Sequence, residues 1–542
     1  MKTSFGLIAV VSLLALISTA TSLTAKEQPT VNPRVEGGTP SQRGHELAPA
    51  QAGDARDTTV YVTFWFDTED FILPQADDAA KRLAEMFTTR GVQATFKIVG
   101  EKAKVLQERG RDDVILALAK NDVAYHSTYH SVHPTPTEYT RDLSWQEGVS
   151  EFIHREGVGL ETVRRVFGVN ASCYGQPGSS WTPQSYAALR TFGIPVYLDV
   201  TSQVNLNDRP FWYGGLLNIL ELGDCVMRTG WTDDEVKQAC AKFDRVSQRL
   251  AQDGGGIISV FYHPCEFVHR QFWDGVNFSH GANPPRSQWK LPPTKSPEEQ
   301  EQAFKAFEAF LDHIVRRADV QLVTAREIPA LYPDRLYSSM GILPMNSGSR
   351  AGSPCYSSPL TRADVRAIAE SFQKRLSYVD LGTRIVSAAE GLAALSQFVA
   401  RSDGDARGDN VAVEFAFGPA STPQRFITEG TFRREAIRQA AQEFIDITHQ
   451  AKQLPSVVWV AGRPLRPEDF AATLANVVAS GRDSGDIVLV RAELEAKKFV
   501  ADDSPNLWGW VIFPEGFTAP RLMELAKLQA WTIKPALLRK AN

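Results

Sequence analysis

Two histidines with a short spacing are the residues of this chain most suited to chemistry. His126 and His130 lie four positions apart, and about sixty residues upstream an apolar run ends in the acidic cluster Asp67-Thr68-Glu69-Asp70. Two imidazoles and one carboxylate form a common ligand set for a catalytic ion of the zinc type, which keeps a coordination position open for water. The spacing fits either a helical turn or a loop, and we expect Ser127 to position it through a backbone hydrogen bond.

The acidic cluster holds more carboxylates than a metal needs. One can bind the ion while another acts as the base that deprotonates water. If the strand continues through the cluster, Asp67 and Glu69 share a face and Asp70 opposes them. If the chain turns at Thr68, this alternation fails, so the residues alone leave base and ligand open.

Three further positions are candidates for the same site. His263 follows the buried-strand run 257–262, and a general acid that protonates a leaving amine is the role that suits it. His133 is an additional candidate ligand, but Pro134 is expected to turn the chain away from the site. In the turn-forming loop 175–181, Trp181 either stacks on a sugar ring or is an ordinary buried side chain.

Alternating strand and helix patterns predict an α/β fold with a parallel sheet. The expected strands and helices of this part are 60–66, 77–90, 92–99, 103–120, 123–125, 196–199, 257–262 and 320–324. Functional groups gather where the strands of such sheets end. Asp67, His126, Asp199 and His263 all lie at predicted strand ends, so we expect them to converge.

Composition and the N-terminal segment limit the class of protein. Of the 542 residues, 43% are hydrophobic and 22% are charged, and the net charge is −5, which argues against a nucleic-acid binder held by bulk electrostatics. Residues 1–22 resemble a cleaved signal peptide, with an uncleaved membrane anchor as the alternative. No second segment reaches membrane-spanning length. We therefore expect an exported protein, whether periplasmic, cell-wall associated or secreted.

The remaining chain divides by composition. A flexible linker is expected at 23–56, a barrel at 57–335, a second linker at 336–354 and a smaller, mainly helical α+β domain at 355–542. No strict internal repeat is visible, although 384–400 and 434–450 share a loose helical pattern. The five cysteines fit no zinc motif, and the sequence allows a disulfide between Cys225 and Cys240.

Taken in order, these motifs resemble those of the polysaccharide deacetylase (NodB-homology) family. The shared features are an acidic strand end, a His-Ser/Thr-x-x-His motif, a proline-containing loop and a late hydrophobic-x-x-His motif. They are matched here by 66–70, 126–130, 175–178 and 260–263. The resemblance covers roughly residues 57–335 and implies a distorted (β/α) barrel.

The resemblance also implies roles for individual residues. Asp67 would be the catalytic base and His263 the catalytic acid, and Asp70, with Glu69 as the alternative, would bind metal together with His126 and His130. The metal would be divalent, with Zn²⁺ expected and Co²⁺, Ni²⁺ or Mn²⁺ possible, and it would activate water for attack on an acetyl group. The expected substrate contacts are Tyr174, Pro177, Trp181 and Asp199, and a backbone N–H near 174–176 would assist the oxyanion.

The sequence departs from the family pattern in three places. The adjacent Asp-Asp pair is stretched to Asp67-Thr68-Glu69-Asp70, which resembles a divergent branch. The arginine that normally holds the base is Gly175, and the Asp-Trp motif that orients the acid histidine is not intact, with Asp199 as the nearest acidic candidate. The sequence therefore predicts the metal site more firmly than the substrate.

The C-terminal region has a weaker likeness, over 436–470, to pseudomurein-binding-type repeats, which implies a module that holds cell-wall glycan near the site. A structural domain that packs on the barrel is the alternative. For the whole chain, the main hypothesis is an exported, metal-dependent deacetylase of a carbohydrate or cell-wall glycan. The rivals are an amidase or deformylase of the same fold acting on a small molecule, and a degenerate glycan-binding module without catalysis.

Overall fold

A computed structural model describes residues 59–337, 359–401, 410–481 and 485–539 of the chain. The predicted signal peptide (1–22), the first linker (23–56) and most of the second linker (336–354) lie outside the described residues. None of the helices within these ranges is long and apolar enough to span a membrane.

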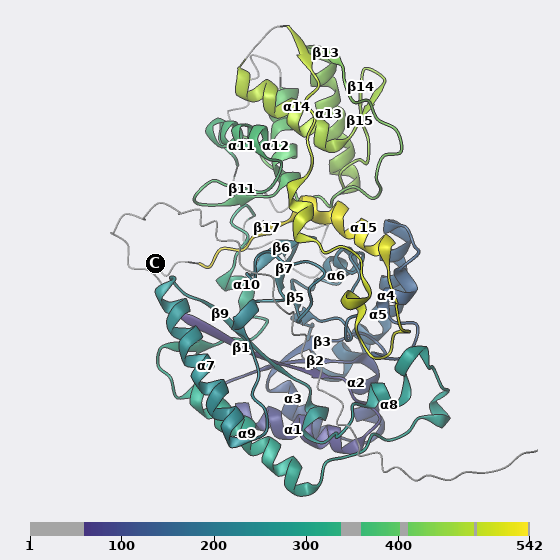
Figure 1. Cartoon of the computed structure of the whole chain (residues 1–542), viewed down its shortest axis with the longest axis vertical. Coiled ribbons are helices and arrows are strands. Elements are labelled where there is room, and N and C mark those ends of the chain that lie inside the picture. Colours follow the sequence, from purple (N-terminus) through teal and green to yellow (C-terminus); the bar gives the residue numbers. More distant parts are fainter. Residues whose placement is uncertain (1–58, 338–358, 402–409, 482–484, 540–542) are drawn as a thin grey trace, which may run out of the picture. The chain divides into compact units, whose positions relative to one another are not determined.

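Most strands belong to one curled, eleven-stranded sheet (Figure 1). Its members are β1 (Val60–Thr68), β2 (Thr95–Ile98), β3 (Asp122–Tyr125), β4 (Cys173–Tyr174), β5 (Val196–Leu198), β6 (Phe211–Tyr213), β7 (Leu216–Ile219), β8 (Val226–Met227), β9 (Gly256–Tyr262), β10 (Val320–Leu322) and β17 (Lys534–Pro535). The order is β17-β6-β7-β5-β4-β3-β2-β1-β9-β8, with β10 pairing to the start of β1. All pairings are parallel except those of β6 with β7 and β17. Since β8 and β17 are edge strands, the barrel is open between them, which confirms the predicted α/β class and distorted barrel.

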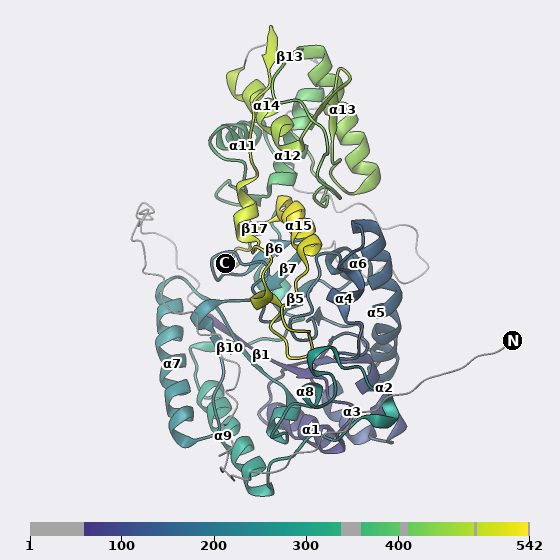
Figure 2. The ribbon, with the colours of Figure 1, turned by 45° about the vertical axis from the view of Figure 1, so that its right-hand side comes forward.

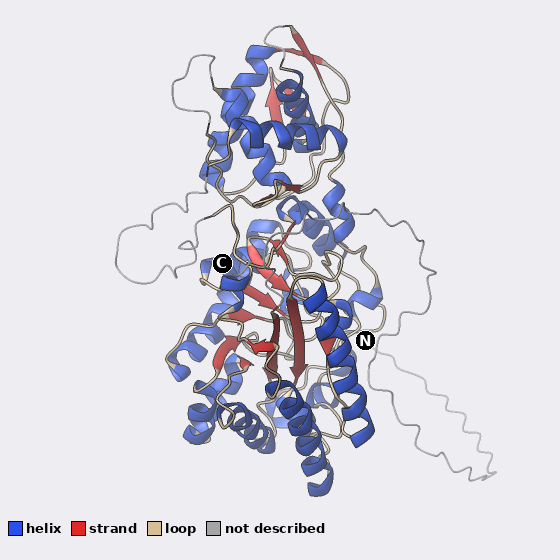
Figure 3. Cartoon of the chain, turned by 90° about the vertical axis from the view of Figure 1, so that its left-hand side faces the viewer, coloured by secondary structure: helices blue, strands red, loops and turns tan. Residues whose placement is uncertain are grey.

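Helices flank this sheet (Figure 3). They are α1 (Pro74–Thr88), α2 (Gly100–Glu108), α3 (Asp112–Ala119), α4 (Pro136–Thr140), α5 (Trp145–Phe167), α6 (Ser185–Thr191), α7 (Asp233–Gln252), α8 (Trp273–Asn277), α9 (Pro297–Val315) and α10 (Ile328–Leu331). Neighbouring pairs include α2 with α5 and α7 with α9 (Figure 2). The helix expected at 103–120 is divided into α2 and α3, with Gly110 between them in a left-handed conformation.

Strand β1 shows how the sequence divides the core from the site. All nine of its residues are buried, and their side chains alternate between two faces. Phe66 packs outward against Phe96 and against Phe307 of α9. On the other face, Trp65 donates a hydrogen bond to the hydroxyl of Ser259, at 2.8 Å, inside the barrel. Asp67 has the same parity as Trp65, so the alternation that builds the core also turns this carboxylate inward.

A second compact set of helices follows the barrel. Its elements are α11 (Arg362–Lys374), β11 (Val379–Asp380), β12 (Ile385–Val386), α12 (Ala388–Ala400), β13 (Thr431–Arg433), α13 (Arg434–Ala451), β14 (Val458–Val460), β15 (Arg463–Leu465), α14 (Pro467–Ser480) and β16 (Asp486–Val488). It contains two helix–hairpin–helix halves, α11 to α12 and α13 to α14, and the first helix of each half packs on the last helix of the other. The similar segments 384–400 and 434–450 thus correspond to α12 and α13, which are not equivalent positions of the two halves.

After β16 the chain returns to the barrel. Backbone hydrogen bonds join Asn205 to Phe499 and Ala501 to Gln203. Helix α15 (Pro520–Gln529) follows, and then β17 pairs antiparallel with β6 at the edge of the sheet. The region that the sequence assigned to one C-terminal domain therefore also supplies residues to the barrel.

Candidate metal centre and catalytic residues

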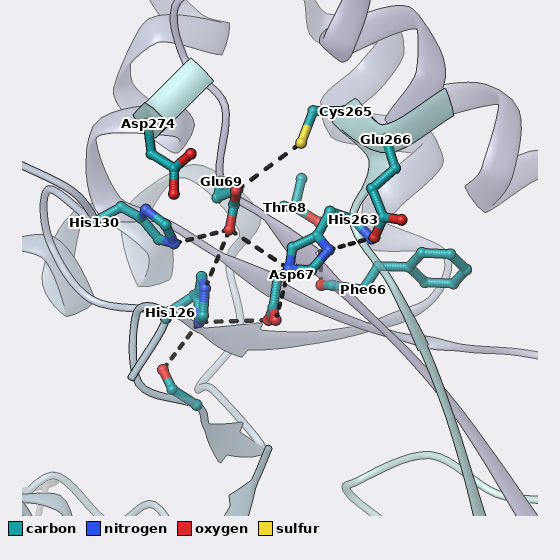
Figure 4. Close-up of polar contacts among 12 residues, drawn as sticks. Phe66, Asp67, Thr68, Glu69, His126, His130, His263, Cys265, Glu266 and Asp274 are labelled. Atoms are coloured by element: carbon teal, nitrogen blue, oxygen red, sulfur yellow. Dashed lines mark hydrogen bonds and ion pairs between the residues drawn. The ribbon is translucent and has the colours of Figure 1, made fainter. Parts of the chain in front are cut away.

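The predicted site residues lie close together at the ends of neighbouring strands (Figure 4). His126 directly follows β3, and His263 directly follows β9. Asp67 is the last residue but one of β1, and Glu69 directly follows that strand. All four side chains are buried or nearly so.

Glu69, His126 and His130 form the group best suited to hold a metal ion. The Glu69 Oε2 atom lies 2.8 Å from His130 Nε2 and 3.6 Å from His126 Nε2. Apart from Glu69 itself, neither ring nitrogen has a polar partner among the described residues, although both are buried. Buried polar atoms are rarely left unpaired. One carboxylate oxygen and two imidazole nitrogens that converge in this way fit a divalent ion of the zinc type.

Neighbouring groups hold these ligands in orientation, as is usual around metal sites. The Nδ1 atom of His126 lies 3.0 Å from the Gly175 carbonyl, which can only accept, so Nδ1 carries the proton and Nε2 is left as the donor to metal. The indole of Trp273 donates a hydrogen bond to the second oxygen of Glu69, at 3.1 Å. Burial lowers the pKa of His126, which favours the neutral form that a ligand needs.

The charge state of Glu69 also suits a ligand. Burial acts to raise its pKa, but the neighbouring His130 and His263 outweigh burial, and the pKa lies well below its usual value. The carboxylate is therefore ionised at neutral pH.

Asp70, the preferred ligand of the sequence prediction, lies elsewhere. Its Oδ2 atom is 2.8 Å from His269 Nε2, and its Oδ1 atom accepts hydrogen bonds from the N–H groups of Ile72 and Leu73. The assignment of Asp70 as ligand is corrected to Glu69, because the chain leaves β1 at Thr68 and the following turn uses the Asp70 carboxylate to cap its own backbone.

The histidine motif is a loop rather than a helical turn. Ser127 and His130 both have positive φ angles, 67° and 54°, a conformation that is unfavourable for residues with a Cβ. The Ser127 hydroxyl accepts a hydrogen bond from the N–H of His130 at 3.1 Å, which confirms the expected role of Ser127. His133 contacts Glu138 at 2.8 Å and does not join the metal group.

A buried lysine, which the sequence reasoning missed, holds the predicted base. Lys97 of β2 is fully buried, and its Nζ lies 2.8 Å from Asp67 Oδ1 and 3.0 Å from Asp199 Oδ2. Burial acts to lower the pKa of Lys97, but Asp199 and Asp67 outweigh it and raise the pKa, so the ammonium is retained. Asp67, His126 and Asp199 also converge closely enough for a metal, but the ammonium already lies between these two carboxylates.

Gly175 makes room for this lysine. A Cβ at position 175 would lie 2.0 Å from Lys97 Nζ and 2.4 Å from Asp199 Oδ2. The cation from β2 therefore requires a glycine at position 175. The sequence did contain a signal for this role, because Lys97 is a charged residue within an apolar strand. In the sheet it lies directly opposite Asp67.

His263 is paired with Glu266 rather than with Asp199. Its Nδ1 hydrogen-bonds Glu266, three residues along the 3₁₀ turn Pro264–Phe267, and its Nε2 lies 3.6 Å from Asp67 Oδ2. Burial acts to lower the pKa of His263, but Glu69, Glu266 and Asp67 outweigh it and raise the pKa to about 9. Arg228 pairs with Glu266 and helps to lower the pKa of that carboxyl to about 2 against the effect of burial. Asp199 is therefore not the group that orients the acid.

The predicted substrate contacts in the 174–181 loop are largely internal. Trp181 is fully buried and packs on Tyr186 and Tyr213, so it cannot stack on a sugar. Tyr174 is also buried, among other tyrosines, and Pro177 is buried in the loop. Trp181 is thus a core residue, because the loop folds its large side chain into the barrel, whereas the roles of Tyr174 and Pro177 stay predictions.

Two other features complete the site's surroundings. A cleft of ≈ 390 Å³ runs between the 127–136 loop and α5, and His130 is the member of the metal group that borders it. Cys225 and Cys240 are both free, so the disulfide allowed by the sequence is not formed.

The chain was compared with known families, curated sequences and solved structures, and only solved structures were found to be similar to it. No family model and no curated protein sequence matches the chain. Among solved structures, the chain is similar to a putative polysaccharide deacetylase from Mycobacterium smegmatis, with 14% identity over 52% of this chain and 93% of the other, and a TM-score of 0.35. It is also similar to a family 4 acetyl xylan esterase from Clostridium thermocellum solved with a cobalt ion, with 12% identity over 50% and 91% of the chains, and a TM-score of 0.27.

A CE4 family pseudoenzyme from Bacillus anthracis is similar as well, with 12% identity over 49% of this chain and 64% of the other, and a TM-score of 0.26. These structures are named as polysaccharide deacetylases or CE4 members, the family that the motifs resemble. At such identities and TM-scores, a function for this chain must come from the chemistry of its own site.

Proposed function

We propose that this protein is a metal-dependent hydrolase that removes acetyl groups from a carbohydrate or cell-wall glycan. The observation that carries the proposal is the convergence of the Glu69 carboxylate with two buried imidazole nitrogens that have no other polar partner, beside a second carboxylate and a protonated histidine. These are the groups that acyl hydrolysis requires. We further propose, from the signal-like residues 1–22, that the protein is exported.

Each residue has a separate task in this proposal. A divalent ion held by Glu69, His126 and His130 would supply Lewis acidity to the acetyl carbonyl and to water. Lys97 engages Oδ1 of Asp67, so Oδ2 is the oxygen left to accept a proton from the attacking water. The water oxygen bonds to the carbonyl carbon, and the bond from that carbon to nitrogen or oxygen of the sugar breaks.

His263 completes the reaction at the leaving group. Its Nδ1 is engaged by Glu266, so the proton on Nε2 is the one that can be donated to the departing amine or alkoxide. The products are acetate and the free amine or hydroxyl of the sugar. With a pKa raised to about 9, His263 carries this proton at neutral pH.

The test is to strip the purified protein of metal, reload it with zinc, and measure bound zinc together with acetate release. Chitin oligosaccharides, peptidoglycan fragments and acetylated xylan serve as the substrate panel. We expect about one zinc per chain and acetate from at least one substrate. His126→Ala should abolish both, whereas His449→Ala, an exposed histidine of α13, should change neither.

The outcomes separate the competing functions. A protein that binds no metal would contradict the proposal. Stoichiometric zinc without acetate from any glycan would instead favour an amidase of the same fold that acts on a small molecule, or a non-catalytic glycan-binding module.

A further inference from the structure

A tryptophan from the C-terminal part of the chain reaches the metal group. Trp510 lies in the segment 503–517, which runs from the returning chain toward α8 (Figure 2). Its ring centroid is 5.2 Å from that of His130, and the two rings meet nearly at right angles, at 83°. A residue far beyond the predicted barrel therefore contacts a metal ligand directly.

The position of this indole is set by specific contacts. The indole N–H donates a hydrogen bond to Asp274 Oδ2 at 2.7 Å, and the backbone N–H donates one to Ser179 Oγ at 3.3 Å. The ring lies on the backbone of Gly178, where a Cβ would come within 2.2 Å of the ring atom Cδ2. Gly178 thus has the function of admitting the tryptophan.

The segment around Trp510 is also anchored. The N–H groups of His280 and Gly281 donate to the carbonyls of Val511 and Ile512, at 3.0 and 2.7 Å. The side chains of Ile512 and Phe513 are buried, and Trp510 packs on Phe513 with ring centroids 5.9 Å apart. A tryptophan held on several sides loses little further freedom when a ligand packs against it.

We infer that Trp510 is a substrate-contacting residue and that the segment 503–517 forms a specificity-determining wall of the site. The inference rests on the proposed function and names the sugar-contacting part of it. Trp510 is partly exposed, and its ring contacts that of His130. Its polar N–H is already satisfied by Asp274, which leaves an apolar aromatic surface for the apolar face of a pyranose ring.

The position of Trp510 can be compared with that of Trp181, the aromatic residue that the sequence predicted as a sugar contact. Trp181 turns into the core, and the indole of Trp510 lies on the Gly178 backbone of that same loop. The sugar carrying the acetyl group would pack on Trp510 while its acetyl carbonyl reaches the metal group.

The test compares Trp510→Ala and Trp510→Phe with the wild type. Trp459→Ala is the matched control, since Trp459 is an exposed tryptophan of β14. For acetate release from chitin oligosaccharides and acetylated xylo-oligosaccharides, we expect Trp510→Ala to raise KM about tenfold and to leave kcat nearly unchanged. Trp510→Phe should retain most of the affinity, and bound zinc should stay at the wild-type level in all variants.

A second measurement does not depend on turnover. Calorimetric titration of the metal-stripped proteins with the same oligosaccharides should show a matching loss of affinity in Trp510→Ala and none in Trp459→Ala. The inference that Trp510 contacts the substrate would be wrong if Trp510→Ala left both KM and binding unchanged, or if the wild type bound none of the oligosaccharides. A wild type that binds the oligosaccharides but releases no acetate would refute the proposed deacetylation. The titrations of Trp510→Ala would still show whether Trp510 contacts the sugar.

Discussion

Lys97 supplies the positive charge that two carboxylates buried inside the barrel require. An unpaired buried ammonium or carboxylate is strongly unfavourable, and two carboxylates that share a buried space repel each other. Lys97 Nζ lies within 3.0 Å of both Asp67 and Asp199, and it also packs over the ring of Trp65 at 4.0 Å. It thereby holds the Asp67 carboxylate in place beside the candidate metal ligands.

We predict that Lys97→Met reduces the rate of acetate release by about a hundredfold or more, which is the usual contribution of a correctly held general base. The variant leaves Asp67 and Asp199 without a counter-charge, so its thermal stability should also fall. Acetate release and thermal unfolding of the same preparations check both effects.

A double variant separates positioning from stability. Lys97→Met combined with Asp199→Asn removes the repulsion between the two carboxylates, so it should regain much of the lost thermal stability but little of the lost rate. Full recovery of activity in the double variant would show that Lys97 acts only on stability.

The pH dependence of the reaction should report the His263–Glu266 pair. The proposed acid works in its protonated form, and the pKa of His263 is raised to about 9, so activity should be present at neutral pH and lost as the pH rises through that value. Glu266→Gln removes a negative charge that raises this pKa, so the alkaline limb of the profile should move to lower pH. The measurement is the pH dependence of kcat/KM for acetate release.

Glu299→Gln provides the control for this shift, because Glu299 is exposed, pairs with Arg270 and is not among the charges that raise the pKa of His263. Its alkaline limb should match the wild type. If the limb of Glu266→Gln stays in place, His263 is not the group that titrates there.

At the scale of elements, helix α5 supports the metal loop through a glycine. Gly159 of α5 faces this loop, and a Cβ there would lie 2.5 Å from Thr128 Oγ1 and 2.7 Å from its Cα. Glu156, one turn earlier, accepts a hydrogen bond from the Thr128 N–H at 2.7 Å. The close approach of helix and loop thus fixes the position of Thr128, the loop residue that follows Ser127.

Two glycines of α5 should respond oppositely to the same substitution. Gly159→Ala should destabilise the protein by about 1–3 kcal/mol through overpacking, and should weaken zinc binding by displacing Thr128. Gly157→Ala meets only Phe192, at an ordinary 3.8 Å, so it should stabilise the protein by up to about 1 kcal/mol through helix propensity. Urea midpoints and zinc titrations of both variants check this, and equal shifts in the two would contradict the role of Gly159.

At the scale of the whole molecule, the returning chain is tied to the rest by a buried charge cluster. Lys534 of β17 lies 2.8 Å from Asp334, which follows α10, and 2.9 Å from Glu390 of α12. Burial acts to lower the pKa of Lys534, but Asp334 and Glu390 outweigh it and raise the pKa. One ammonium therefore joins the sheet, the end of the barrel and the second set of helices.

We predict that Lys534→Met destabilises the protein by about 3–5 kcal/mol, because it leaves two buried carboxylates without their cation. Lys527→Met is the control, since its partner Asp502 is 93% exposed, and its unfolding midpoint should equal that of the wild type. Chemical denaturation measures both, and equal unfolding midpoints of Lys534→Met and Lys527→Met would contradict the prediction.

Much of the barrel and of the metal site could be predicted from sequence because both depend on local patterns. Buried-strand runs and helical periodicity locate β1, β2, β3 and β9, and strand ends in a parallel sheet must meet. The residues His126, His130, Asp67 and His263 therefore converge as expected. The choice of Glu69 over Asp70 could not be made, because it depends on where the chain leaves β1 and what the next turn requires.

The α/β class and a metal-type cluster at the carboxyl ends of the strands could be inferred from the order of the residues, since side-chain alternation and motif spacing are local properties of the chain. The cation that holds Asp67, the carboxylate that holds His263 and the aromatic ring that contacts His130 became known only from the fold. Lys97 and Trp510 are brought to the site by strand pairing and by a returning segment, across separations that no local pattern records. The candidate metal ligands could thus be predicted from the sequence, whereas the contact of Trp510 with them could not.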